Sequence, residues 1–193
     1  MKRLLIAMLA LVMPLAGCAQ REFAGLAQSP GPSTVGLTLP RVDTGNDFEL
    51  VAPQDGLLIV YFGYTSCPDI CPTTMQDVTA ALRRLNHPAS VQVAMVTVDP
   101  DRDIPVLQNY VRSFVEDGIA LGTTDDSRLA RAAQIFGASY LVSTNDSGEV
   151  EVAHSTALYV VDDAGTLLLT WQFGTASRDI ADDLEDLLDG RRP

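Results

Sequence analysis

The spacing of hydrophobic residues predicts alternating strands and helices between residues 57 and 115. The continuous apolar run at 57–62 is typical of a strand that is buried on both faces of a sheet. From Pro72 the apolar positions recur with helical spacing until the turn sequence at 86–88. The valine-rich stretch 91–98 then predicts a second strand, and 104–115 predicts a second helix. The region is therefore expected to fold as strand, helix, strand, helix.

Two further helices are expected after residue 120. One covers about residues 127–136, because Asp125 or Asp126 can cap its start and Gly137 can end it. The other is an amphipathic helix over residues 179–188, close to the end of the sequence.

A β-hairpin is predicted between these two helices. Its strands are the apolar runs 157–161 and 167–173, and the sequence Asp-Asp-Ala-Gly between them is a strong turn signal. A βαβ unit followed by a hairpin and a final helix, with a cysteine pair after the first strand, indicates an α/β domain of the thioredoxin-like fold. We expect a central mixed β-sheet flanked by helices, formed by residues 40–193.

The beginning of the chain resembles a bacterial secretion signal. Two basic residues precede an apolar stretch at 4–16, which is shorter than the ~20 residues needed to cross a bilayer. Leu-Ala-Gly-Cys at 15–18 resembles the lipobox of bacterial lipoproteins, whose cysteine is lipidated and becomes the first residue of the mature chain. We expect a signal peptide over 1–17 and a lipid anchor on Cys18. The alternatives are a secreted protein with an incidental Cys18 and an uncleaved transmembrane anchor.

Residues 18–39 are expected to form the anchor and a flexible tether. They lack apolar periodicity, and residues 28–33 are rich in proline, glycine and serine. A protein built in this way is held in the cell envelope, with its domain on the extracytoplasmic, periplasmic side. Both the inner and the outer membrane are compatible with the pattern.

The charge balance disfavours one class of partner. The chain has 13 basic and 25 acidic residues, a formal net charge of −12 at pH 7. Loss of Lys2 and Arg3 with the signal peptide would leave 11 basic against 25 acidic residues, or −14. Because such a surface repels phosphate backbones, we expect no nucleic-acid binding. Ordinary solubility, a basic partner or a metal cation are compatible with this charge.

Two cysteines, Cys67 and Cys71, lie where the first strand gives way to the first helix. If Pro72 is the first helical residue, Cys71 occupies the cap position, where the helix N-terminus stabilises a thiolate. Four residues are about one helical turn, so both sulfurs can face one metal ion. A structural disulfide is the simplest alternative, but closing so short a loop would add little stability to a domain of this size.

The chain has two histidines, His87 and His154. His87 lies at a helix end, where an exposed cap is the more ordinary role. His154 precedes the first strand of the predicted hairpin, on a segment that can approach the cysteines. Two thiolates and one imidazole form a three-ligand set suited to copper, whereas structural zinc normally takes four ligands. His154 is therefore a candidate ligand, although a lone histidine beside a strand is more often structural.

Three motifs, in this order along the chain, resemble those of the SCO1/SenC family. They are FGYTSCPDICPTT at 62–74, VTVDPDRD at 96–103, and a His-Ser pair at 154–155 before an apolar strand. The similarity extends over roughly residues 37–188. Members of that family are membrane-tethered, thioredoxin-like copper proteins that help to assemble the dinuclear copper centre, CuA, of cytochrome c oxidase.

The resemblance implies a metallochaperone rather than an enzyme. Cys67, Cys71 and His154 match the three copper ligands of the family, where two thiolates would hold Cu(I) and the imidazole would help the site to accept Cu(II). The implied partners are the copper site of cytochrome c oxidase subunit II and a periplasmic copper donor or thiol reductant. Asp69 matches an acidic residue between the cysteines. The family commonly has an aspartate before the histidine, whereas this chain has Ala153, so a carboxylate that could orient the imidazole is missing.

Two other functions are compatible with the cysteine pair. A thiol–disulfide oxidoreductase could use it to reduce the cysteines of the oxidase copper site. The spacing Cys-x-x-x-Cys argues mildly against a general oxidoreductase, which usually has Cys-x-x-Cys. A peroxide-reducing enzyme could use one of the two thiolates.

Two other metal sites are rejected. Asp99, Asp101 and Asp103 alternate as in a calcium loop, but the glycine and the glutamate that such a loop needs at its sixth and twelfth positions are absent. These aspartates are expected to end a strand and start a helix. Met75 and Met95 fall on apolar faces, which predicts core packing rather than copper binding.

Overall fold

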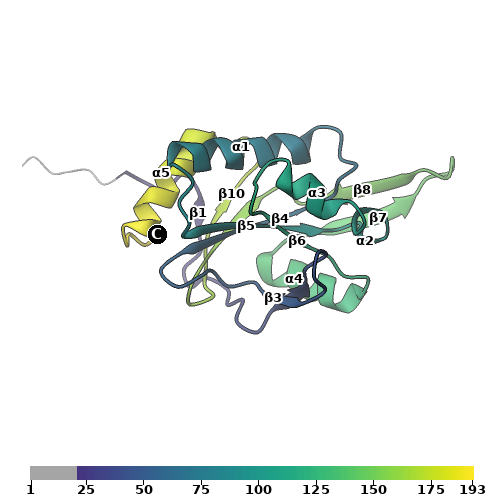
Figure 1. Ribbon diagram of the computed structural model, residues 1–193, viewed down its shortest axis with the longest axis horizontal. Helices are drawn as coiled ribbons and strands as arrows, with labels where there is room; N and C mark the ends of the chain where they lie inside the picture. Colours follow the sequence, from purple (N-terminus) through teal and green to yellow (C-terminus); the bar gives the residue numbers. More distant parts are fainter. Residues whose placement is uncertain (1–20) are drawn as a thin grey trace, which may run out of the picture.

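The computed structural model describes residues 21–193 (Figure 1). A six-stranded mixed sheet forms its centre, with the strand order β1-β10-β9-β4-β5-β6. Two separate pairs, β2-β3 and β7-β8, lie outside that sheet. The predicted signal peptide over 1–17 and Cys18 lie outside the described residues.

The described residues form ten strands and five helices. The strands are β1 (Leu26–Ala27), β2 (Thr38–Pro40), β3 (Asp47–Glu49), β4 (Leu57–Gly63), β5 (Val91–Thr97), β6 (Ile119–Leu121), β7 (Tyr140–Thr144), β8 (Val150–His154), β9 (Leu158–Asp162) and β10 (Leu167–Trp171). The helices are α1 (Ile70–Arg84), α2 (Pro100–Asp103), α3 (Leu107–Arg112), α4 (Asp126–Phe136) and α5 (Ser177–Leu188).

The centre of the sheet has the predicted topology. β4 and β5 are parallel and connected by α1, while β9 pairs antiparallel with β4 and forms a hairpin with β10. With α5 after the hairpin, this is the thioredoxin-like arrangement of a βαβ unit joined to a ββα unit. The predicted mixed α/β fold is confirmed.

Hydrophobic clusters cover both faces of the sheet. β4 is buried along its whole length, and its alternate residues point into opposite clusters, as expected for a central strand. Leu57, Ile59 and Tyr61 join the cluster beneath α1 and α5. Leu58 and Phe62 join the cluster on the other face, where α4 packs (Figure 1).

The helix predicted over residues 104–115 is wrong in its bounds. The chain instead forms the short helix α2 before this range and α3 within it, separated by a turn at 104–106. Pro105 lies in that turn. Proline has no N–H to donate and restricts the residue before it, so it separates the two helices.

The predicted flexible tether is also wrong over residues 21–39. β1 pairs with the edge strand β10, Leu37 and Leu39 are buried in the core, and β2 pairs with β3. The folded domain therefore begins at least as early as Arg21 rather than at residue 40. Turn-forming residues are compatible with a fixed path because a few side chains anchor the segment to the sheet.

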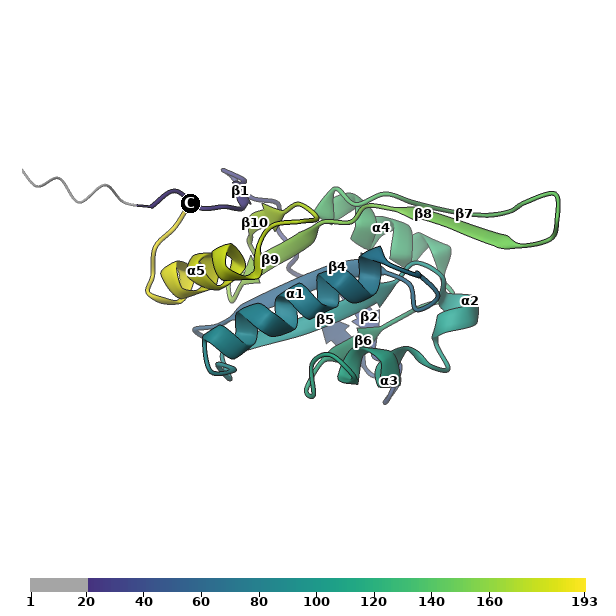
Figure 2. The ribbon, with the colours of Figure 1, turned by 90° about the horizontal axis from the view of Figure 1, so that it is seen from above.

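The hairpin β7–β8 was not predicted from the sequence. It projects past the end of the sheet (Figure 2), and its residues are mostly exposed, including the apolar Leu141, Val142 and Val150. Its last residue is His154. None of the helices formed by residues 21–193 combines the length and hydropathy needed to span a bilayer.

Candidate metal centre

The start of α1 places the two cysteines. α1 begins at Ile70, two residues earlier than predicted, so Cys71 lies in the first helical turn and not at the cap. Its backbone N–H points at the Sγ atom of Cys67, 3.4 Å away. The sulfur that the helix N-terminus stabilises is therefore that of Cys67. This corrects the predicted assignment to Cys71.

The loop before α1 is held by a buried aspartate. Asp103 is fully buried and accepts hydrogen bonds from the backbone N–H of Thr65 at 3.0 Å and from its hydroxyl at 2.5 Å. It also accepts a bond of 2.6 Å from the Thr97 hydroxyl at the end of β5. The carboxylate ties the cysteine loop to the sheet, which is a structural role, as expected for this aspartate.

His154, at the end of strand β8, lies beside the cysteines. Its Nδ1 atom lies 2.7 Å from the carbonyl oxygen of Ser155. Because a carbonyl only accepts, Nδ1 carries the proton and donates it, and Nε2 keeps its lone pair. Nε2 lies 3.6 Å from the Sγ atom of Cys71. The neighbouring Ala153 is exposed, and the Ser155 carbonyl supplies the orientation that a carboxylate at 153 was expected to supply.

The three candidate ligands converge. One ligand atom from each of Cys67, Cys71 and His154 lies within 4.8 Å of the others. Cys71 is buried, whereas Cys67 and His154 are partly exposed, so the group is open on one side. Both cysteines are free thiols. His87 lies in the turn beyond the far end of α1, about 20 Å along the helix from the cysteines.

The two thiols have opposite acidities. Burial opposes ionisation of Cys67, but hydrogen bonds from the backbone N–H groups of Cys71 and Asp69 outweigh it and lower the pKa. Burial raises the pKa of Cys71 to about 12. In the absence of metal, Cys67 is therefore the more acidic thiol of the pair.

Two tyrosines that were not predicted from the sequence as part of the site lie beside the three candidate ligands. Tyr61 and Tyr64 contact the His154 ring edge-on, with centroids 6.2 and 5.5 Å away. Within the described residues, the hydroxyls of Tyr61 and Tyr110 are buried without a hydrogen-bond partner. The sequence did contain an indication of the role of Tyr61, because its hydroxyl is the one polar side-chain group in the buried strand β4.

Comparison with known proteins identifies the family. The family model described as SCO1/SenC matches residues 42–189. The chain belongs to the SCO1/SenC family. An SCO2-like protein of Rickettsia felis is 30% identical to it over 173 residues, which cover 82% of this chain and 83% of that relative.

Solved structures agree with this SCO1/SenC assignment. The solution structure of the apo Sco1 protein from Thermus thermophilus shares 30% identity with a TM-score of 0.73, covering 88% of this chain and 99% of that one. The structure of ScoI from Bradyrhizobium japonicum with copper bound shares 25% identity with a TM-score of 0.66, covering 81% of this chain and 97% of that one.

Proposed function

We propose that this protein binds copper through Cys67, Cys71 and His154 and assists the assembly of the CuA centre of cytochrome c oxidase. The observation that carries the proposal is the convergence of two sulfurs and one imidazole nitrogen within 4.8 Å. Soft thiolates favour Cu(I), and the added imidazole is suited to copper in either oxidation state. The copper bound in the similar ScoI structure supports the choice of metal.

The exposure of the ligands suits a metal that is delivered rather than kept. Cys71 is buried and would hold copper from the protein side, while Cys67 and His154 are partly exposed. An incoming thiolate from the oxidase subunit can replace these two ligands first. Each exchange forms one metal–ligand bond as another breaks, so free copper is never released.

Membrane attachment through a lipid on Cys18 forms part of the proposal. Arg21 is fixed to α5 by its ion pair with Asp183. In the sequence, only two residues separate Arg21 from Cys18. The described chain starts beside α5, whereas the hairpin that carries His154 lies at the other end of the molecule (Figures 1 and 2). An anchored domain would thus present its metal site away from the membrane, on the periplasmic side.

The test is a Cu(I) titration of the reduced domain with a competing chelator. The protein should bind one copper, and Cys67→Ala and Cys71→Ala should each reduce the affinity strongly. His154→Ala should mainly weaken Cu(II) binding. His87→Gln is the matched control, because it removes the other histidine and should change nothing. Full affinity in all three ligand variants would overturn the copper site.

The assembly role needs a separate test in cells. Cells that lack the protein should contain oxidase subunit II with a depleted CuA centre, and the intact gene should restore it. A Cys67→Ala, Cys71→Ala double variant should not. Normal CuA content in the deletion strain would remove the assembly role while leaving copper binding intact.

Reduction of the CuA-site cysteines is a second candidate function, favoured by the two free thiols and the lowered pKa of Cys67. The Cys67 thiolate would attack a target disulfide and form a mixed disulfide, and Cys71 would then displace the target. The products are a Cys67–Cys71 disulfide and two reduced target thiols, so two electrons pass to the target. The raised pKa of Cys71 predicts a slow second step. Stopped-flow kinetics with an oxidised target peptide would measure it.

A further inference from the structure

The hydroxyl of Tyr61 is an unpaired polar group in the hydrophobic core. The side chain is fully buried in β4, and its oxygen has no hydrogen-bond partner among residues 21–193. Leaving a buried hydroxyl unpaired costs free energy, and most buried polar groups in native proteins are paired. The unpaired Tyr61 hydroxyl lies beside a candidate metal site, which suggests that it gains a hydrogen-bond partner when the site holds metal.

Cys71 is the group that can become that partner. The Tyr61 ring and the Cys71 sulfur both lie next to Gly63. A Cβ atom added to Gly63 would lie 2.7 Å from Cε1 of Tyr61 and 3.2 Å from Sγ of Cys71. The glycine at 63 leaves the space in which the two side chains meet.

Thr74 is the other polar neighbour of Tyr61. Its hydroxyl donates a hydrogen bond of 2.8 Å to the carbonyl of Ile70, one turn earlier in α1. The Thr74 proton is therefore already used, and its oxygen is left only as an acceptor. A permanent bond from Tyr61 to Thr74 would be purely structural, which gives a rival account that experiment can separate.

The strength of Cys71 as an acceptor changes with its protonation. A thiol sulfur accepts hydrogen bonds weakly, whereas a ligand to copper is a thiolate, because metal binding displaces the proton. Hydrogen bonds to charged groups are roughly twice as strong as those between neutral groups. The Tyr61 hydroxyl thus gains a good acceptor only when the site carries metal.

We propose that Tyr61 is a positioning residue that donates a hydrogen bond to the Cys71 thiolate in the copper-loaded protein and thereby favours Cu(I) over Cu(II). This inference rests on the proposed copper binding. A hydrogen bond withdraws electron density from the sulfur, which weakens its donation to Cu(II) more than to Cu(I). Hydrogen bonding around a cysteine ligand is a known control of copper potentials.

The test is Tyr61→Phe, which removes one oxygen and keeps the ring. The metal-free variant should unfold at a higher temperature than the metal-free wild type, because an unpaired buried hydroxyl is gone. The copper-loaded variant should still bind one copper. Its sulfur-to-Cu(II) charge-transfer band should move to longer wavelength, and its Cu(II)/Cu(I) reduction potential should fall.

Tyr110→Phe is the matched control. Tyr110 lies in α3, and its hydroxyl is likewise buried and unpaired within the described chain, but it has no hydrogen-bonding contact with Cys71. Its removal should raise the unfolding temperature of the metal-free protein and leave the band and the potential unchanged.

Three results would overturn the inference. An unchanged band and potential in Tyr61→Phe, with one copper bound, would do so and would leave the proposed function standing. A lower unfolding temperature with an unmoved spectrum would assign the hydroxyl to Thr74. Equal spectral shifts in Tyr110→Phe would show a general effect of the tyrosines. If the wild type itself binds no copper, the proposed function fails first and this inference fails with it.

Discussion

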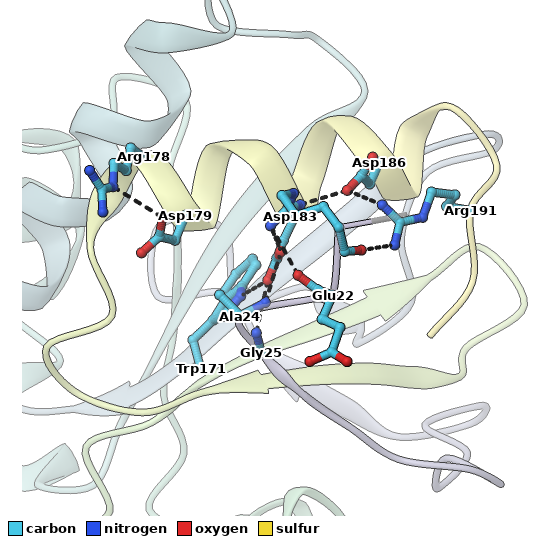
Figure 3. Close-up of polar contacts among 10 residues, drawn as sticks. Glu22, Ala24, Gly25, Trp171, Arg178, Asp179, Asp183, Asp186 and Arg191 are labelled. Carbon is cyan, nitrogen blue, oxygen red and sulfur yellow. Dashed lines mark hydrogen bonds and ion pairs between the residues drawn. The ribbon is translucent and has the colours of Figure 1, made fainter. Parts of the chain in front are cut away.

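Two polar centres border the same hydrophobic cluster, and they differ in how completely their groups are paired. Asp183 of α5 accepts hydrogen bonds from the indole of Trp171, from the backbone N–H groups of Ala24 and Gly25, and from Arg21 (Figure 3). Every one of these contacts lies between 2.8 and 3.1 Å. These contacts join the first described residues to α5, and both oxygens of the buried Asp183 carboxylate accept hydrogen bonds.

At the cysteine end of the cluster, the polar groups are paired less completely. Cys67 and Cys71 are not joined in a disulfide, Nε2 of His154 meets Sγ of Cys71 at the long distance of 3.6 Å, and the Tyr61 hydroxyl has no hydrogen-bond partner in the described chain. A satisfied polar network rigidifies a fold, whereas an unsatisfied one is costly unless a ligand completes it. The closely paired centre is therefore structural, whereas the loosely paired one is a candidate binding site.

The largest effect is expected at the satisfied centre. Asp183→Ala should lower the free energy of unfolding by about 3–5 kcal/mol, because it leaves buried N–H groups unpaired. Urea denaturation measures this. The control is Asp186→Ala, which removes partly exposed ion pairs to Arg21 and Arg191 and should lose no more than about 1 kcal/mol. A loss below about 1 kcal/mol in Asp183→Ala would contradict the structural role.

The next effect tests how rigidly the open centre is supported. Asp103→Ala releases Thr65 and with it the cysteine loop, so Cu(I) affinity should fall roughly 10–100-fold, as for other residues that orient metal ligands. Competition with a chromophoric chelator measures the affinity. Asp101→Ala, which changes an exposed aspartate of the same helix, should keep the wild-type value. Equal affinities in both variants would show that the loop needs no anchor.

A smaller effect concerns the acidity of the two thiols. In the reduced, metal-free protein, the lowered pKa of Cys67 moves its alkylation to lower pH, and the pKa of Cys71 near 12 moves its alkylation to higher pH. At pH 8, iodoacetamide should modify Cys67 at least roughly ten times faster than Cys71. Peptide mass spectrometry over time gives both rates. Faster modification of Cys71 would restore the assignment predicted from the sequence.

The smallest effect is expected at Ala153. Adding the carboxylate that the family commonly carries, by Ala153→Asp, should change Cu(II) affinity less than about threefold, because the Ser155 carbonyl already fixes the imidazole. The measurement is a Cu(II) titration beside the wild type. A gain of tenfold or more would show that the imidazole lacks an orienting group.

The sequence predicted the centre of the fold better than its margins. The apolar run of β4, the capping aspartate of α4 and the turn of the β9–β10 hairpin are local signals, and each was confirmed. The β7–β8 hairpin and the packing of residues 21–39 depend on contacts with distant parts of the chain. The strands of the hairpin do carry apolar residues, but Leu141, Val142 and Val150 are exposed, so the apolar pattern does not mark a buried face.

The convergence of the three candidate ligands was predicted from the sequence, but the details of their surroundings were not. The approach of His154 to the cysteines was expected from chemistry and resemblance, and the structure brings the three together. A two-residue shift in the start of α1 then moved the stabilised thiolate from Cys71 to Cys67. Such shifts are common at helix ends. The unpaired hydroxyl of Tyr61 depends on three-dimensional packing and has no local sequence signature beyond its place in an apolar strand.

Copper K-edge X-ray absorption spectroscopy of the Cu(I)-loaded domain can show directly whether Cys67, Cys71 and His154 bind the metal. We expect a first coordination shell of two sulfur atoms and one nitrogen atom, and loss of the nitrogen in His154→Ala. A shell that contains no sulfur, or one that His154→Ala leaves unchanged, would contradict this expectation.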